Sequence, residues 1–255
     1  MLREFYALFA REVLKTYRNV AVVVMMVAQP IIWLAFFGSS FGSAPASFLT
    51  EFFHTSNYIA FLLPGIMTVS MLFVGMFGAM SLIQDKRLGF LKRILVSSPS
   101  KPAIFLGKVF GAMTRGLFGI PILLIVALAF GVSLPANPMA YVDLVGALFF
   151  FSLGMVSIYF IITIRSSDWQ TPGVIANFIN LPLMFASTAI FPETLFPSWM
   201  RTIASFNPVT YAADVGRGAL LSTGVNAVYI LYLALFGIAF MALGMFLSKK
   251  WLSAD

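Results

Sequence analysis

Six apolar runs, each long enough to cross a lipid bilayer, constrain this chain more than any other feature. A hydrocarbon core about 30 Å thick needs roughly 20 helical residues to span it. Runs of this kind occupy residues 19–37, 58–83, 109–130, 141–164, 173–191 and 225–247. A helix satisfies its own backbone hydrogen bonds, as a spanning segment in lipid must. We therefore predict an all-α polytopic membrane protein with six transmembrane helices.

The composition excludes most soluble classes of protein. Hydrophobic residues make up 60% of the chain and charged residues only 10%, whereas a soluble domain is roughly a quarter charged. The absence of cysteine excludes disulfides, thiol nucleophiles and thiolate metal sites. The net charge of +7 suits nucleic-acid binding, but the cations lie beside the predicted crossings. We therefore expect contact with a lipid membrane and none with nucleic acid.

The distribution of Lys and Arg predicts an orientation. Six crossings place both termini on one side, and that side receives 14 of the 16 basic residues. Only Arg201 and Arg217 fall on the other side. Cytoplasmic loops of membrane proteins carry an excess of Lys and Arg. We therefore predict that both termini and the loop of residues 84–108 are cytoplasmic.

Residues 1–18 precede the first run and form a separate predicted element. Apolar side chains at spacings of three and four share one helical face: Leu2, Phe5, Phe9, Val13 and Tyr17. Most of the cations lie away from that stripe: Arg3, Arg11, Lys15 and Arg18. This pattern is typical of a helix that lies in the headgroup plane with its apolar face down. We predict an amphipathic interfacial helix, with a solvated leader as the alternative, and one six-helix transmembrane domain over residues 19–255.

The loop of residues 84–108 contains a predicted short amphipathic helix that Pro99 closes. Its apolar ridge comprises Leu88, Leu91, Ile94 and Leu95, and the cations Lys92 and Arg93 flank this ridge. A helix of this kind across the cytoplasmic end of a bundle could be displaced by a partner protein that binds it. An ordinary basic loop is the alternative, because positive charge is expected on this side in any case.

The stretch of residues 192–224 is too polar to span, yet it carries many large apolar side chains. Ser198 is a plausible N-cap for a short helix there. The pair Asn207-Pro208 would end that helix, because the residue before a proline is pushed out of the helical region. We predict two short re-entrant helices that dip into the outer leaflet before the last crossing.

The predicted spans are almost free of ionisable groups. Arg115 lies toward the cytoplasmic end of the third run and Asp143 near the outer end of the fourth. The single histidine, His54, lies in an outer loop, and no phosphate-binding Gly-x-x-x-x-Gly-Lys-Ser/Thr motif is present. We expect no catalytic residue, cofactor or metal on this chain. If transport is driven, the energy must come from another polypeptide.

Two other classes of function remain as alternatives. An intramembrane lipid-modifying enzyme would need polar clusters, for which Asn177, Asn180 and Asp168 are sparse candidates. A structural or assembly protein would not need the basic helix of the cytoplasmic loop.

Two blocks of the sequence resemble the signatures of ABC-2 type transporter permeases. The first is the pattern charged–Gly-x-Leu–charged–x-x-Leu-Val-x-x-Pro from Lys86 to Pro99, followed by Gly107-Lys108. The second runs from Phe191-Pro192 to Arg217 and includes Asn207-Pro208-Val209-Thr210-Tyr211. With the amphipathic first helix and the six runs, the resemblance covers essentially the whole chain. It is greatest to the daunorubicin-resistance-like multidrug exporters of that family.

The resemblance implies an ATP-driven exporter of the prokaryotic plasma (inner) membrane. Two permease chains, as a homodimer, would form the pathway, and ATP and Mg would bind on separate ATPase subunits. The exported substrate would be an amphipathic drug, a lipid or a glycan.

The resemblance also assigns roles to residues. Those of the ATPase-coupling interface would be Asp85, Lys86, Arg87, Leu88, Gly89, Phe90, Leu91, Lys92, Arg93 and Leu95. The N-terminal helix, with Phe5, Phe9, Arg11, Val13 and Lys15, would lie beside that interface. An outer re-entrant gate would contain Pro192, Trp199, Asn207, Pro208 and Tyr211.

Overall fold

The computed structural model describes residues 2–41, 45–96, 100–166, 168 and 170–251, and across these ranges it is helical without a strand. The first six helices are α1 (Leu2–Tyr17), α2 (Val20–Phe41), α3 (Ala46–Phe53), α4 (Tyr58–Arg87), α5 (Phe90–Val96) and α6 (Lys101–Ala129). The remaining helices are α7 (Pro138–Ile164), α8 (Thr171–Phe185), the 3₁₀ turn η1 (Glu193–Leu195), α9 (Ser198–Ala204), α10 (Pro208–Leu220) and α11 (Ala227–Trp251). The predicted all-α class is confirmed.

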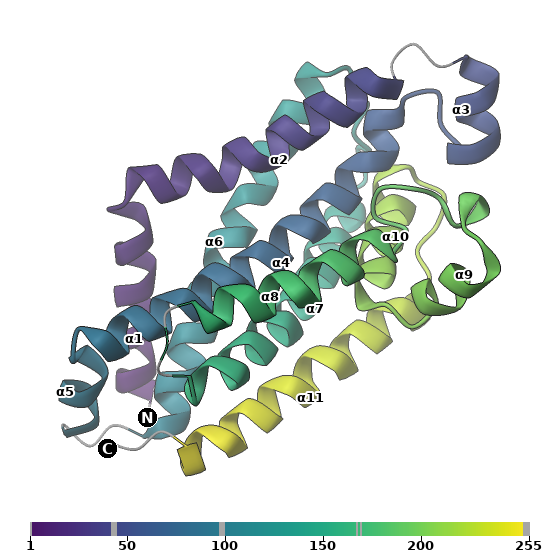
Figure 1. The fold of residues 1–255 in the computed structure, drawn as a ribbon. Helices are drawn as coiled ribbons and strands as arrows, with labels where there is room; N and C mark the ends of the chain where they lie inside the picture. The colour runs from purple at the N-terminus through teal and green to yellow at the C-terminus, as the bar shows by residue number, and fades with distance from the viewer. Residues whose placement is uncertain (1, 42–44, 97–99, 167, 169, 252–255) are drawn as a thin grey trace.

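Long apolar helices form the body of the molecule, and α4 and α7 lie at its centre (Figure 1). Within the residues that the structure describes, four segments are long and apolar enough to cross a membrane: Ser47–Arg87, which contains α4, Lys101–Ala129, Pro138–Ile164 and Ala227–Trp251. Two shorter apolar helices, Val27–Phe41 and Gly173–Phe185, fall on the first and fifth predicted runs. The chain is a polytopic membrane protein.

One end of the molecule gathers the start of α1, the helix α5, the start of α6 and the end of α11 (Figure 1). The Glu4 carboxylate accepts hydrogen bonds of 3.1 Å from the backbone N–H and the hydroxyl of Ser100. Lys101 Nζ donates to the carbonyl of Lys249 at 3.3 Å. We call this the basic end, because it carries Lys86, Arg87, Lys101, Lys249 and Lys250.

At the other end of the bundle the chain comes very close to α4 at Gly65. A Cβ atom built on Gly65 would lie 1.8 Å from the carbonyl oxygen of Ala189. Only glycine permits that approach at this position, which directly follows Pro64 in the second turn of the helix. The turn after α8 therefore rests against the backbone of α4.

The helix α8 ends at Phe185, earlier than the predicted run of residues 173–191. Asn207, the N-cap of α10, and Arg217, within α10, donate hydrogen bonds to backbone carbonyls at and just after the end of α8. Asn207 Nδ2 donates to the carbonyls of Leu183 and Ala186, both at 2.8 Å. Arg217 donates to the carbonyls of Thr188 and, at 2.9 Å, Ala189. Non-helical backbone at membrane depth requires such protein partners, and a hydropathy pattern does not reveal them.

The region of residues 192–224 contains the two predicted short helices, α9 and α10. Pro197 occupies the N-cap position of α9, and Ser198 is its first helical residue rather than the predicted cap. The helix α10 is more enclosed than expected. Its buried residues include Val209, Ala213 and Gly216, and a Cβ on Gly216 would lie 2.7 Å from Pro64 Cβ. This helix is therefore a packed part of the bundle.

Replacing Gly65 with Ala should destabilise the protein, because the new methyl group would overlap the Ala189 carbonyl oxygen. Overpacking of this kind costs about 1 to 3 kcal/mol or more. The matched control is Gly146→Ala on α7, where an added Cβ meets nothing within 4 Å. The control should gain up to about 1 kcal/mol of helix propensity. Thermal unfolding in detergent would measure both, and equal midpoints for the two variants would contradict the close approach.

Candidate functional site

Six charged side chains from three helices meet near the basic end. They are Arg11, Glu12 and Lys15 of α1, Asp85 of α4, and Lys108 and Arg115 of α6. We call this group the ionic cluster. It contains four cations and two carboxylates, so its formal charge is positive by two.

Lys108 lies at the centre of the ionic cluster with a side chain only 2% exposed. Its Nζ donates to Glu12 Oε1 at 2.8 Å and also to Asp85 Oδ2. Arg11 binds both Asp85 oxygens, at 2.9 and 3.0 Å, in the bidentate geometry that gives strong ion pairs. Lys15 reaches the same carboxylate at 3.3 Å. These contacts tie α1 to both α4 and α6.

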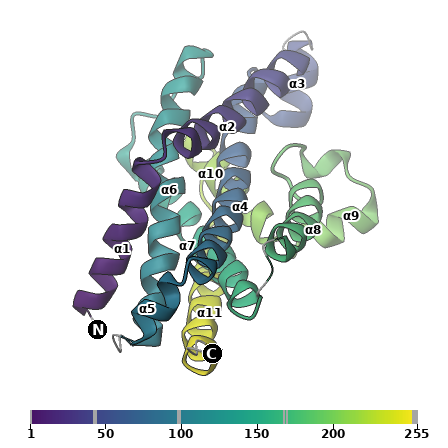
Figure 2. The same cartoon turned by 60° about the vertical axis from the view of Figure 1, so that its left-hand side comes forward.

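Small residues on α6 let α1 come close enough to make these bonds. A Cβ on Gly107 would lie 2.7 Å from Leu8 Cβ, and a Cβ on Gly111 would lie 2.5 Å from Glu12 Cβ. Gly107 and Gly111 are four residues apart and therefore share one face of α6. Figures 1 and 2 both show α1 running alongside α6. The N-terminal helix thus docks on protein along this face.

The charge state of Glu12 follows from its neighbours. Burial raises the pKa of the Glu12 carboxyl, but the charge and hydrogen bond of Lys108 and the charge of Arg115 outweigh it, and the net shift is below the ordinary value of 4.5. A lowered pKa stabilises the folded state above about pH 4.5, and this contribution is lost as the pH falls through the folded value. At neutral pH Glu12 is therefore ionised and holds α1 in place.

The predicted loop helix is present as α5, but the loop around it is shorter than residues 84–108. Residues 84–87 form the last turn of α4, and residues 101–108 belong to α6. Gly89 makes the turn between α4 and α5 with a φ of 67°, a left-handed conformation that favours glycine. Pro99, the predicted end of the helix, lies outside the described residues.

The helix α5 is anchored to the ionic cluster. The guanidinium of Arg11 lies over the Phe90 ring, 3.4 Å from its centre, while it binds Asp85. Leu91, on the predicted apolar ridge, is buried at 4% exposure. Both contacts place α5 against the helices that the cluster joins.

The residues assigned to coupling divide into inward and outward groups. Asp85 is buried in the ionic cluster, and Lys86 Nζ donates to the carbonyls of Thr163, Ile164 and Ser166 at the end of α7. The exposed side chains are Arg87, Leu88 and Arg93. The side chains of Lys92 and Leu95 lie outside the described part of the structure. An outward surface of Arg87, Leu88 and Arg93 remains; we call it the α5 surface.

Arg11 and Lys15, predicted on the polar face of α1, join Asp85 in the ionic cluster. Phe5 and Phe9 stack with ring centres 6.0 Å apart, and Phe5 meets Phe110 of α6 edge-on at 5.9 Å. Val13 is half-buried. The face that α1 buries carries Leu8, Glu12 and Thr16 rather than the predicted apolar stripe.

The sequence pattern gives no sign that three inner members of the ionic cluster, Glu12, Lys108 and Arg115, come together. Glu12 is 96 residues from Lys108 and 103 from Arg115, and their pairing depends on how α1 packs. One usable signal was present. Gly107 and Gly111 have the four-residue spacing of small side chains that allows close helix contact, and they mark the face of α6 on which Glu12 docks.

The residues assigned to the outer gate lie at the far end. Asn207 and Pro208 form the cap and first turn of α10, and the Tyr211 hydroxyl donates to the Ser205 carbonyl. The Tyr211 ring stacks on Tyr232 of α11 at 5.4 Å. Trp199 is 64% exposed and Pro192 is buried. Of these residues Trp199 is exposed, whereas Asn207 and Tyr211 connect α10 to neighbouring helices.

The described residues contain no group of three or more His, Asp and Glu side chains that could bind a metal ion. The polar contacts of this part of the chain include ion pairs and cations on carbonyl groups. Such an arrangement fixes helices relative to one another.

An all-helical chain with several long apolar helices belongs to the class of multi-pass membrane proteins. The sequence model of the ABC-2 type transporter family matches residues 3–221. The chain belongs to this family, as the resemblance predicted, and is a transport permease of that type.

Named relatives agree with this assignment. The chain is 29% identical over 232 residues to the ycf38 transport permease of Pyropia yezoensis, covering 89% of this chain and 77% of the relative. It is 26% identical over 214 residues to the corresponding permease of Cyanophora paradoxa, covering 84% and 72%. It is 25% identical over 199 residues to the daunorubicin resistance ABC transporter permease DrrB1 of Streptomyces coeruleorubidus, covering 78% and 68%.

Replacing Asp85 with Asn should release α1, because Arg11, Lys15 and Lys108 would lose their shared carboxylate. Breaking a buried ion pair by removing one partner costs about 3 to 5 kcal/mol. We expect a lower unfolding midpoint and faster trypsin cleavage after Arg11 and Lys15.

The matched control is Glu51→Gln on α3, where the side chain is exposed. A surface change of this type shifts stability by only about 0.5 kcal/mol. Equal cleavage in the Asp85 and Glu51 variants would show that the ionic cluster does not hold α1.

Proposed function

We propose that the chain is the membrane subunit of an ATP-driven ABC exporter and that separate ATPase subunits drive it through the α5 surface. One observation carries this proposal. The exposed Arg87, Leu88 and Arg93 lie on a short segment whose inner side chains contact Arg11 of α1 and join an apolar cluster with residues of α4 and α6. A partner bound there would act on three helices at once. Family membership supports the same assignment.

The helix α4 offers a mechanical link from the α5 surface to the far end of the bundle. It is 30 residues long, which corresponds to about 45 Å at 1.5 Å per residue. Asp85 near its end joins the ionic cluster, and Gly65 contacts the turn after α8. A displacement of α5 would therefore reach the segment beside α10. We propose that this segment and α10 open and close the outer exit.

The proposed topology has six crossings, with α2 and α8 completing the set that α4, α6, α7 and α11 begin. Both the start of α1 and the end of α11 lie at the basic end, which supports an even number of crossings (Figure 1). By the positive-inside rule the basic end is cytoplasmic. We place the protein in the plasma (inner) membrane of a prokaryote.

We further propose that two copies of this chain form the pathway and that ATP and Mg bind on the ATPase partners. The exposed apolar side chains of α8, including Val174, Phe178 and Leu181, offer a face for a second copy. The exported substrate is an amphipathic drug, a lipid or a glycan. The daunorubicin resistance permease among the relatives favours the first of these.

Reversing the charge of Arg93 to Glu should weaken binding of the ATPase, because this side chain is exposed on α5 and, among the described residues, donates only to the Leu88 carbonyl, at 3.4 Å. Loss of a hydrogen bond to a charged group costs about 1.5 to 3 kcal/mol, so we expect at least about tenfold weaker association. Co-purification from native membranes, followed by an ATPase assay, would measure it.

Lys250→Glu is the matched control, because Lys250 is an exposed cation at the same end but on α11. It should leave co-purification and ATPase activity unchanged. Equal loss in both variants would indicate a general charge effect, and no loss in either would contradict docking at the α5 surface.

A further inference from the structure

A pocket with a volume of about 180 Å³ lies between α2, α4 and α6, with the end of α1 beside it. Its walls are largely apolar and include Trp33, Ile66, Met71, Phe77 and Leu123. Cavities of about 150 Å³ lined by apolar side chains bind small apolar molecules such as benzene. The pocket can therefore hold an apolar group of that size or a length of hydrocarbon chain.

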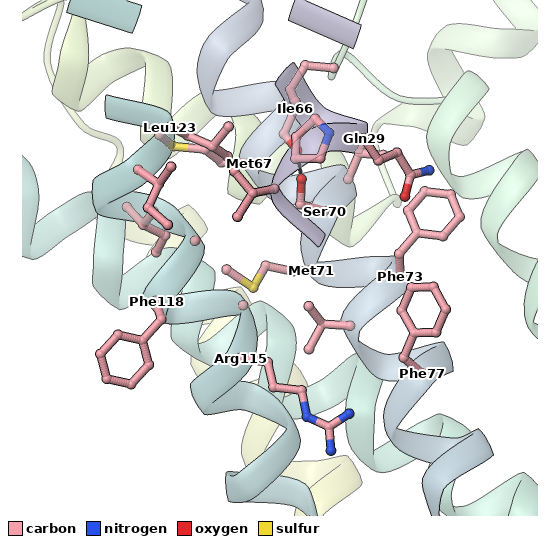
Figure 3. A pocket seen from close by; sticks show the side chains of 18 of the residues that line it. Gln29, Ile66, Met67, Ser70, Met71, Phe73, Phe77, Arg115, Phe118 and Leu123 are labelled. Atoms are coloured by element: carbon pink, nitrogen blue, oxygen red, sulfur yellow. Dashed lines mark hydrogen bonds between the residues drawn. The ribbon is translucent and has the colours of Figure 1, made fainter. Parts of the chain in front are cut away.

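One end of the pocket is charged. Figure 3 shows Arg115 at this end, with Met67 and Leu123 toward the other. The Arg115 side chain is 7% exposed. Within the described part of the chain its guanidinium donates one hydrogen bond, from Nη2 to Glu12 at 3.1 Å, while its buried Nε–H has no acceptor. A guanidinium carries five N–H donors, so Arg115 retains capacity for a second anion.

The surrounding charge favours an anion over a cation at this end. Arg115 belongs to the ionic cluster, in which four cations face two carboxylates. Glu12 already accepts hydrogen bonds from Lys108, Ser81 and Arg115. A ligand with a negative group would therefore meet an excess of positive charge and a free donor. Guanidinium groups match the geometry of phosphate oxygens particularly well.

The orientation of the pocket matches that of a lipid. Its charged end is the end nearer the ionic cluster, and its apolar part extends along α6 from Arg115 to Leu123. This distance is about 12 Å at 1.5 Å per residue. With the basic end on the cytoplasmic side, as proposed above, a lipid of the inner leaflet would place its head by Arg115 and its chain toward the membrane centre.

We propose that this pocket binds one acyl chain of an anionic phospholipid, whose phosphate pairs with Arg115. Tyr17 and Phe118, which meet edge-on at 5.6 Å, line the same pocket and would flank the bound chain. The site needs neither the ATPase partner nor transport. It relies on the proposed topology only for the leaflet from which the lipid comes.

The test uses Trp33 as a reporter, because its side chain lines the pocket. The full chain carries Trp169→Phe, Trp199→Phe and Trp251→Phe, which leaves Trp33 as the single tryptophan of the original four. The purified protein is reconstituted in vesicles with increasing amounts of phosphatidylglycerol or phosphatidylcholine, brominated on the acyl chain. Bromine quenches tryptophan fluorescence on contact. We expect half-quenching at about tenfold less phosphatidylglycerol, the ratio for one charge-assisted hydrogen bond.

Two pairs of variants locate the effect. Arg115→Gln should remove the preference for phosphatidylglycerol, whereas Arg115→Lys should retain part of it. Gly119→Leu should reduce quenching by both lipids, because Gly119 lines the pocket and an added Cβ there meets nothing within 4 Å. Gly146→Leu, an equally open glycine outside the pocket, should leave quenching unchanged.

Equal quenching by the two lipids in the parent protein would overturn the anionic site. Unchanged quenching in Gly119→Leu would overturn the pocket itself, and this variant keeps the ionic cluster intact. Selective quenching by a brominated fatty acid, with none by phosphatidylglycerol, would overturn the assignment to a phospholipid. None of these outcomes bears on ATPase binding at the α5 surface, so the two proposals fail independently.

Discussion

The contact of Lys108 with both Glu12 and Asp85 is the interaction on which the basic end of this permease depends. All three side chains are buried, at 2%, 3% and 1% exposure. Buried charges are costly unless they are paired, so each helix that carries one needs the others in place. The first helix, the loop helix and the start of α6 are positioned together for this reason.

A second set of polar contacts fixes the far end by different chemistry. Arg217 and Asn207 bind backbone carbonyls that the early end of α8 leaves without helical partners. Arg217 also donates to the carbonyl of Phe61 on α4, at 3.1 Å. The central helix α4 thus meets a charged anchor near each end. In the mechanism we propose, the ATPase displaces α4 at the ionic cluster. The displacement then moves the segment that Arg217 and Asn207 hold, beside the outer exit.

The sequence predicted features that depend on local pattern. Apolar runs located the long helices, and the spacing of Leu88, Leu91 and Leu95 predicted a short helix where α5 lies. Features that depend on packing were missed. The end of α8 at Phe185 requires Asn207, which follows 22 residues later, and the partner of Glu12 is 96 residues away. Hydropathy carries no information about either contact, because both join polar atoms across helices.

The proposed mechanism requires contact between the α5 surface and an ATPase. A photoreactive amino acid at position 88 tests it most directly, because Leu88 is 66% exposed on that surface. Position 206 serves as the comparison, since Phe206 is 81% exposed at the far end. Irradiation of native membranes should join position 88, but not position 206, to a nucleotide-binding ATPase chain identified by mass spectrometry. Adducts of position 88 with lipid alone, or the same adducts from both positions, would contradict this contact.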